Sequence, residues 1–194
     1  MTESRTATAR ALTVLRRPFL AETWKRVAYL LLALPVGALC VPLALAGGPA
    51  GRVQRGLARV LLGVEVAAPE RAGRVRGLAH AVLSLPLNLV AALVTVYGWW
   101  LVPMNLGYPL RPDAHPETDW GGPTLVGAWL THAIPGGVTF LLVMPWIGRG
   151  LTTSQSRLLT ALLGTGHAPG PTLVRALLTV AIGGALAWPV VNQL

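Results

Sequence analysis

The sequence predicts an all-α integral membrane protein with three to four transmembrane helices, amphipathic interfacial helices and a degenerate internal repeat. Hydrophobic residues make up 53% of the 194 residues and charged residues only 12%, about half the charged share of soluble domains. The mean hydropathy is +0.58. Charged side chains are absent from three long stretches, 77–110, 121–148 and 176–194. As helices, which satisfy their own backbone hydrogen bonds in lipid, such runs cross about 30 Å of hydrocarbon.

The charges that remain are strongly unbalanced. Fifteen Arg and the single Lys25 oppose seven acidic residues, for a net charge of +9. Arg-rich flanks are typical of the cytoplasmic side of membrane proteins. Nucleic-acid binding would instead need a solvated basic domain with a recognition element, which the sequence lacks. Cys40 is the only cysteine, so neither a disulfide framework nor a metal site is expected, and no cofactor is expected.

Two basic segments have the pattern of amphipathic helices. Residues 1–26 form a leader in which Leu12, Leu15 and Phe19 recur at near-helical spacing among arginines. Residues 52–77 begin with apolar side chains on one face of a helix and arginines elsewhere. Both segments therefore predict helices that lie on an anionic, cytoplasmic membrane surface.

The later part of the chain alternates between apolar runs and polar connections. Each apolar run is a candidate transmembrane helix, and Trp residues near the ends of the runs match the aromatic belt of a membrane interface. The predicted elements are a helix over 78–103, an external loop over 104–122, a helix over 123–147, a cytoplasmic linker over 148–171 and a helix over 172–191.

The first apolar run, 27–51, poses a topological conflict. The loop 104–122 carries one Arg against three acids, which places it outside the membrane and the N-terminus inside. The basic segments on both sides of the run then belong to the cytoplasmic side as well. Charge thus favours a re-entrant segment broken between Pro35 and Pro42, because arms of about eight residues reach only about 12 Å. A kinked single span with its arginines outside is the alternative, and the sequence leaves both open.

The chain also resembles itself at two offsets. Tyr29–Pro35 matches His80–Pro86, 51 residues later, and Gln54–Gly63 matches Gln155–Gly164, 101 residues later. Each half therefore begins with an apolar helix that carries Leu-Pro and closes with an amphipathic helix that ends in Leu-Leu-Gly. The repeat predicts that both amphipathic helices lie on the same, cytoplasmic side.

Six short segments carry a family resemblance that covers roughly residues 13–166: Arg16–Phe19, Thr23 and Trp24, Ala28–Pro35, Leu61–Val64, Leu85 and Pro86, and Ala161–Gly164. These residues resemble the membrane sensor domain found in front of histidine kinase modules in high-GC Gram-positive bacteria. That resemblance implies two membrane hairpins joined by a cytoplasmic linker. The chain departs from the pattern, because the return helix of the first hairpin is missing and the apolar run 172–191 stands in place of a kinase module. The resemblance therefore implies a stand-alone, shortened sensor domain.

His132 is the first candidate for chemistry. It lies inside the run 123–147, shortly before Pro135 and two glycines, and an ionisable group at such depth often faces a bundle interior or a cavity. The alternative is a neutral imidazole bonded to a backbone carbonyl that Pro135 leaves free. Asn88 is the second candidate, either facing His132 across the bundle or joining helices by hydrogen bonds.

The loop 104–122 holds a cluster of carboxylates, Asp113, Glu117 and Asp119. These side chains are candidates to bind a cation or a basic peptide, or to act as general acid and base. The favoured explanation is structural: they are the charges of a solvated, Pro-rich external loop. Their spacing does not define a metal site.

Two functions follow. The first is a non-enzymatic, sensor-like or accessory module of the bacterial cytoplasmic membrane, multi-pass with a cytoplasmic N-terminus. It would contact the lipid bilayer or a lipid-like ligand and act through a partner protein or a homo-oligomer. The alternative is a membrane-embedded enzyme for a lipid or isoprenoid substrate, with His132, Asn88 and the acidic loop around one cavity. A cavity that brings two of these groups to one substrate atom would distinguish the two functions.

Overall fold

The computed structural model describes residues 11–67 and 74–165, together with Val174, Leu178 and Ala181. Every element in this part of the chain is helical, and three helices are long and apolar enough to cross a membrane: Ala21–Leu45, Val75–Leu106 and Leu125–Leu163. These findings confirm the all-helical part of the prediction. The elements are η1 (Arg17–Phe19), α2 (Ala21–Leu45), α3 (Ala50–Leu62), α4 (Arg74–Leu106), η2 (Tyr108–Leu110), α5 (Leu125–His132), the π-helix η3 (Ala133–Val138) and α6 (Thr139–Leu163).

Backbone contacts divide the chain into two compact units. Of the described residues, the loop unit comprises 11–23 and Val96–Ile147, and the bundle unit comprises those within Trp24–Thr95 and from Gly148 onward. The predicted fourth span, 172–191, lies outside the described residues apart from the three named above, which are helical.

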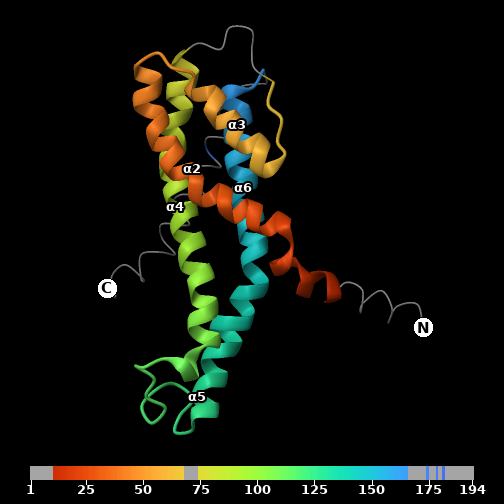
Figure 1. Cartoon of the computed structure of the whole chain (residues 1–194), viewed down its shortest axis with the longest axis vertical. Helices are drawn as coiled ribbons and strands as arrows, with labels where there is room; N and C mark the ends of the chain where they lie inside the picture. Colours follow the sequence, from red (N-terminus) through yellow and green to blue (C-terminus); the bar gives the residue numbers. More distant parts are fainter. Residues whose placement is uncertain (1–10, 68–73, 166–173, 175–177, 179–180, 182–194) are drawn as a thin grey trace, which may run out of the picture. The chain divides into compact units, whose positions relative to one another are not determined.

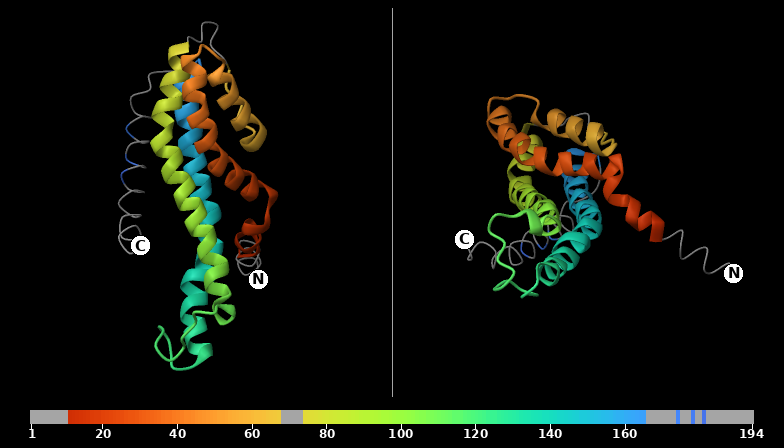
Figure 2. Two further views of the ribbon diagram at one scale, coloured as in Figure 1. Left: turned by 60° about the vertical axis from the view of Figure 1, so that its left-hand side comes forward. Right: turned by 60° about the horizontal axis from the view of Figure 1, so that its bottom comes forward.

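In the bundle unit, α2, α3, the first part of α4 and the last part of α6 pack side by side (Figures 1 and 2). The buried residues of α2 follow helical spacing along one stripe, so α2 offers a single packed face. One apolar cluster joins α2, α3 and α6, and a second joins α2, α3 and α4. Their buried members are Tyr29, Ala33, Ala58, Leu159 and Leu163 in the first, and Cys40, Ala44, Ala50 and Ala81 in the second.

The first apolar run is a bent but unbroken helix, as in the second of the two forms that the sequence left open. The predicted break between Pro35 and Pro42 does not occur, because α2 is continuous through both prolines and ends at Leu45. Its 25 residues extend about 37 Å. Both prolines are exposed on the face opposite the packed stripe, so α2 bends without losing its contacts, as Figure 1 shows.

The end of the expected run belongs to the next helix. A turn through Gly47, whose φ of 81° suits glycine, reverses the chain, and α3 already begins at Ala50. Cys40 of α2 donates a hydrogen bond from Sγ to the carbonyl of Ala50 at 3.7 Å. This hydrogen bond connects the last turns of α2 to the first residue of α3, and it therefore helps to close the hairpin that the two helices form.

The helices α3 and α6 end at repeat-matched positions. α3 ends at Leu62 and is capped by Gly63 in the left-handed conformation, with φ of 67°. α6 ends at Leu163, so most of the predicted linker 148–171 that the structure describes is helical. The last carbonyls of α6 receive hydrogen bonds from two arginine side chains, which is a favourable place for positive charge. These are Arg55 Nη1 to Leu163 O and Arg76 Nη1 to Gly164 O, both 3.4 Å.

In the loop unit, the last turns of α4 pack closely against α5, η3 and the start of α6. Glycines make this approach possible: a Cβ at Gly137 would lie 2.6 Å from Cδ2 of Leu106. α5, η3 and α6 follow one another without a break in the chain's helical structure, and the π-helix contains Pro135. A proline has no N–H to donate, so the ladder of backbone hydrogen bonds is disturbed at that turn.

The N-terminal leader is helical over residues 11–16 and then turns through η1. Thr23 donates a hydrogen bond to the carbonyl of Arg17 at 2.7 Å, and the Arg17 guanidinium lies 3.8 Å from the ring centre of Trp146. Leu15 and Phe19 are 53% and 73% exposed. The leader thus presents large apolar side chains outward, as an amphipathic interfacial helix does.

Candidate functional site

A row of polar side chains is buried inside the bundle unit. His80, Ser84 and Asn88 follow one another at intervals of four residues along α4, so they lie on one face of the helix. Their exposed fractions are 6%, 3% and 5%. Buried polar groups need hydrogen-bond partners, and the neighbouring helices supply them.

Two glutamines bind the two ends of this row. His80 Nδ1 lies 2.7 Å from Gln54 Oε1 of α3, and because an amide oxygen only accepts, Nδ1 carries the proton. Gln155 Nε2 of α6 donates to Asn88 Oδ1 at 2.8 Å. Asn88 Nδ2 donates in turn to the carbonyl of Ala33 in α2 at 3.0 Å. These hydrogen bonds connect α4 to each of the other three helices of the bundle unit.

Gly37 gives Asn88 the space that it needs. A Cβ at Gly37 would lie 3.0 Å from Asn88 Nδ2 and 3.7 Å from Leu85 Cδ2. The absence of a side chain on α2 therefore allows the amide of α4 to reach the backbone of α2. Small residues serve the same purpose where membrane helices approach closely.

A small cavity of about 20 Å³ lies among these side chains. By the same measure one water molecule needs about 10–15 Å³, so the cavity is of water size. Two buried amide atoms, Gln54 Nε2 and Gln155 Oε1, have no hydrogen-bond partner. The cavity, called the polar pocket below, is lined by Tyr29, Ala33, Val36, Gly37, Gln54, Leu57, His80, Ser84, Asn88, Gln155, Leu158 and Leu159.

Most of the lining residues form pairs that the sequence repeat matches. At the offset of 101 residues Gln54 matches Gln155, and at the offset of 51 residues Tyr29 matches His80. The same offsets pair Ala33 with Ser84, Gly37 with Asn88, and Leu57 with Leu158. Sequence reasoning proposed only Asn88 of these residues as a site residue. The available signal was a polar residue recurring at both matched positions, as at Gln54 and Gln155.

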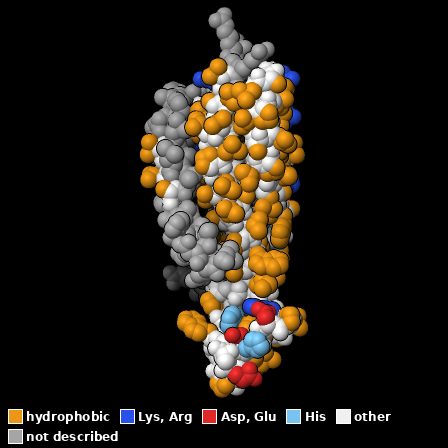
Figure 3. Space-filling view, turned by 90° about the vertical axis from the view of Figure 1, so that its left-hand side faces the viewer, with side chains coloured by type: hydrophobic (Ala, Val, Ile, Leu, Met, Phe, Trp, Pro, Cys, Tyr) orange, Lys and Arg blue, Asp and Glu red, His pale blue; other side chains and the backbone are white. Residues whose placement is uncertain are grey.

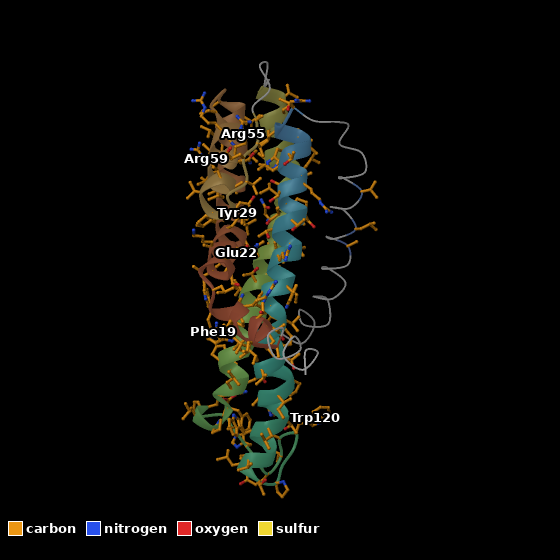
Figure 4. The ribbon with its side chains drawn as sticks, turned by 90° about the vertical axis from the view of Figure 1, so that its right-hand side faces the viewer. Phe19, Glu22, Tyr29, Arg55, Arg59 and Trp120 are labelled. Carbon is orange, nitrogen blue, oxygen red and sulfur yellow. The ribbon has the colours of Figure 1, made fainter. Side chains whose placement is uncertain are left out.

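A second hollow, called the arginine hollow below, lies on the outer side of α3. It is open and measures about 610 Å³. Arg52, Arg55 and Arg59 line it from α3, and Glu65 adds one negative charge. Figure 4 shows Arg55 and Arg59 on this helix. The inner face of α3 therefore contributes Gln54 to the polar pocket, and its outer face carries the three arginines of the hollow.

His132 is held locally in the loop unit. Its Nδ1 lies 2.7 Å from the carbonyl of Ala128, one turn earlier, and its ring stacks on Tyr108 with centroids 4.6 Å apart. The acceptor is not the carbonyl of Thr131, four residues before Pro135, which the sequence argument expected proline to free. His132 lines neither the polar pocket nor the arginine hollow, and Asn88 has its partners within the bundle unit.

The acidic loop is ordered by its own side chains. Asp119 Oδ2 accepts hydrogen bonds from the Tyr108 hydroxyl at 2.6 Å and from the backbone N–H of His115 at 3.1 Å, and both lower the pKa of Asp119. Burial, together with Asp119, raises the pKa of Tyr108 to about 12. Arg111 forms a two-pronged pair with Asp113, at 2.6 and 3.1 Å, which lowers the pKa of that carboxyl.

The third loop carboxylate, Glu117, has an exposed side chain, and Figure 3 shows acidic and histidine side chains gathered together. Within the described residues, no three His, Cys, Asp or Glu side chains are placed to hold a metal ion. Trp120 is 86% exposed and points away from the helices (Figure 4). The loop is therefore folded by its own hydrogen bonds: Asp113 and Asp119 have partners within it, and Glu117 faces solvent.

Replacing Asp119 by asparagine should lower the pKa of Tyr108 from about 12 toward its ordinary value of about 10, because the variant lacks the negative charge that disfavours the phenolate. Ultraviolet absorbance of the phenolate during a pH titration measures the change. Glu117→Gln is the control, since it removes an exposed charge from the same loop. In the wild type, the stability that Tyr108 contributes is present below pH 10 and is lost as pH rises through about 12. An unchanged titration in Asp119→Asn would contradict the effect of the Asp119 charge on the pKa of Tyr108.

Comparison with known proteins gives no information on the function of this site. No family model, curated protein or solved structure matches this chain. The resemblance to bacterial membrane sensor domains therefore stays a prediction.

Proposed function

We propose that this chain is a multi-pass, sensor-like or accessory module of a bacterial cytoplasmic membrane, without catalysis of its own, that binds anionic phospholipid and acts through a partner protein. The observation that carries the proposal is the contrast between two cavities in the described part of the chain, the polar pocket and the arginine hollow. The polar pocket has room for about one water molecule, which is too little for a lipid or isoprenoid substrate. The arginine hollow is about thirty times larger, open, and lined by positive charge.

Anionic phospholipid fits the chemistry of α3 better than a soluble anion does. The three arginines of the hollow match a phosphate group. Val53 and Val60, on the same helix, are 42% and 70% exposed and would meet acyl chains. A basic helix with exposed apolar side chains is typical of an interfacial helix on an anionic membrane surface.

Binding to phosphatidylglycerol should depend on the hollow rather than on net charge. In Arg52→Gln/Arg59→Gln, affinity should fall about 30-fold, from about 1 kcal/mol per arginine near an anionic surface. Arg55 is kept, because it also bonds the end of α6. Native mass spectrometry of the whole chain in detergent, titrated with phosphatidylglycerol, measures the fraction of protein that keeps the lipid bound.

The matched control is Arg149→Gln/Arg157→Gln, which removes the same charge from exposed positions of α6 outside the hollow. It should retain the lipid, and phosphatidylcholine should not bind in either protein. Equal losses in both double variants would refute a specific site. Displacement of the lipid by inorganic phosphate would identify a free-phosphate site instead.

The proposal includes a topology with a cytoplasmic N-terminus and an external loop 104–122. The Arg-rich flanks support it, as does the acidic character of that loop. In a Cys40→Ala background, Ala114→Cys should be labelled by a membrane-impermeant thiol reagent in intact cells. Labelling only after lysis would reverse the orientation.

We also infer that the chain is a degenerate duplication. Its support is the convergence of matched pairs on the polar pocket and the matching ends of α3 and α6, at Leu62 and Leu163. In this arrangement the hairpin α2–α3 corresponds to the first part of α4 and the last part of α6. The turn of this hairpin would then lie on the cytoplasmic side, because the start of α3 lies beside the end of α6, where Arg55 Nη1 donates to the carbonyl of Leu163.

A further inference from the structure

The polar pocket contains two amide atoms that the protein itself leaves unpaired. They are Gln54 Nε2 on α3 and Gln155 Oε1 on α6. The two residues are only 6% and 3% exposed, and both line the pocket. Each glutamine uses its other amide atom in a hydrogen bond, to His80 and to Asn88 respectively. One unpaired atom is a donor and the other an acceptor, and a buried polar atom without a partner destabilises the fold.

The volume and the polarity of the pocket select its occupant. About 20 Å³ exceeds the roughly 10–15 Å³ that one water needs and excludes any organic molecule. A cation is disfavoured because the unpaired atom of Gln54 is a donor, Nε2. Water both accepts and donates, which is what this pair of atoms requires.

We infer that the polar pocket is a binding site for one ordered water molecule, which accepts a hydrogen bond from Gln54 Nε2 and donates one to Gln155 Oε1. The water completes a buried chain that runs from His80 through Gln54, the water, Gln155 and Asn88 to the carbonyl of Ala33. This chain crosses all four helices of the bundle unit. Through it α3, which also carries the arginine hollow, is joined to α6. The inference does not depend on the proposed lipid binding.

Nuclear magnetic resonance detects such a water directly. The whole chain is labelled with ¹⁵N-glutamine in detergent micelles, and the side-chain signal of Gln54 is assigned by its loss in Gln54→Met. We expect a rotating-frame Overhauser cross-peak between the Gln54 amide and water. The peak should disappear in Gln155→Met, which keeps the length of the side chain but removes the acceptor. It should persist in Thr95→Val, because Thr95 donates within α4, to Ala91.

Absence of the cross-peak in the wild type would overturn the inference, as would a peak that Gln155→Met leaves unchanged. If Gln155→Met does not fold, Gln155→Asn takes its place in the test, because the shorter side chain moves the acceptor away from the pocket by one methylene group. Stability gives a second measurement. Gln54→Met and Gln155→Met remove the same bridge, so the double variant should lose less in its unfolding midpoint than the sum of the single losses. Strictly additive losses would indicate a dry pocket and would also overturn the inference.

Discussion

Replacing Asn88 by alanine should lower the free energy of unfolding by about 2–3 kcal/mol, because a buried donor and acceptor are lost together. Gln155 Nε2 loses its acceptor, and the hydrogen bond to the carbonyl of Ala33 disappears. The expected loss exceeds the average of about 0.6 kcal/mol for one interhelical hydrogen bond in a membrane protein, since one side chain here connects three helices. Reversible unfolding in mixed micelles with increasing sodium dodecyl sulfate measures the change.

Leu89→Ala is the matched control. Leu89 follows Asn88 on α4 and is 47% exposed, so the variant removes a larger apolar group from the outer face of the same turn. We expect its free energy of unfolding to change by only about 0.5 kcal/mol. If Leu89→Ala were as destabilising as Asn88→Ala, the polar row would not be what holds the bundle unit together.

The helical class was predictable because lipid leaves little choice of backbone structure. Long charge-free runs must form helices in order to satisfy their N–H and C=O groups, and each of the three long apolar helices contains most of one predicted run. The bounds were less predictable: α2 begins and ends six residues before the run 27–51, and the third helix continues sixteen residues beyond 147, to Leu163. The run 27–51 was harder to predict. Its prolines signalled a break, but a proline on the exposed face of a packed helix bends it without ending it.

The site was predicted only in part, because its chemistry depends on contacts between helices. Asn88 was interpreted correctly as a residue that joins helices by hydrogen bonds. His80 and Gln54 were not selected, since neither stands out until α3 is packed against α4. His132 stood out by its depth in an apolar run, yet an imidazole can satisfy itself on its own helix and a neighbouring aromatic ring. The paired glutamines of the repeat were the better signal.

Gly137 and Gly150 differ in the space around them, although the sequence gives no sign of the difference. A Cβ at Gly137 would lie 2.6 Å from Cδ2, 2.8 Å from Cγ and 3.3 Å from the backbone nitrogen of Leu106. The first two atoms belong to the Leu106 side chain, which would have to rotate, whereas the backbone nitrogen is held by α4 and would have to move by a few tenths of an ångström. At Gly150, inside α6, a Cβ meets nothing within 4 Å. The same substitution therefore tests close packing at one position and helix propensity at the other.

Gly137→Ala should destabilise the protein by about 1–3 kcal/mol, as overpacking does in other cores, because α4 and the π-helix must separate. Gly150→Ala should instead stabilise it by up to about 1 kcal/mol, since alanine restricts the unfolded chain and favours the helix. Unfolding midpoints of the two variants and of the wild type, measured in the same micelles, show whether each substitution stabilises or destabilises the protein. Stabilisation by Gly137→Ala would show that the last turns of α4 do not rest on this glycine, and that the loop unit is held by other contacts, such as the hydrogen bond from Trp129 Nε1 to the carbonyl of Leu106.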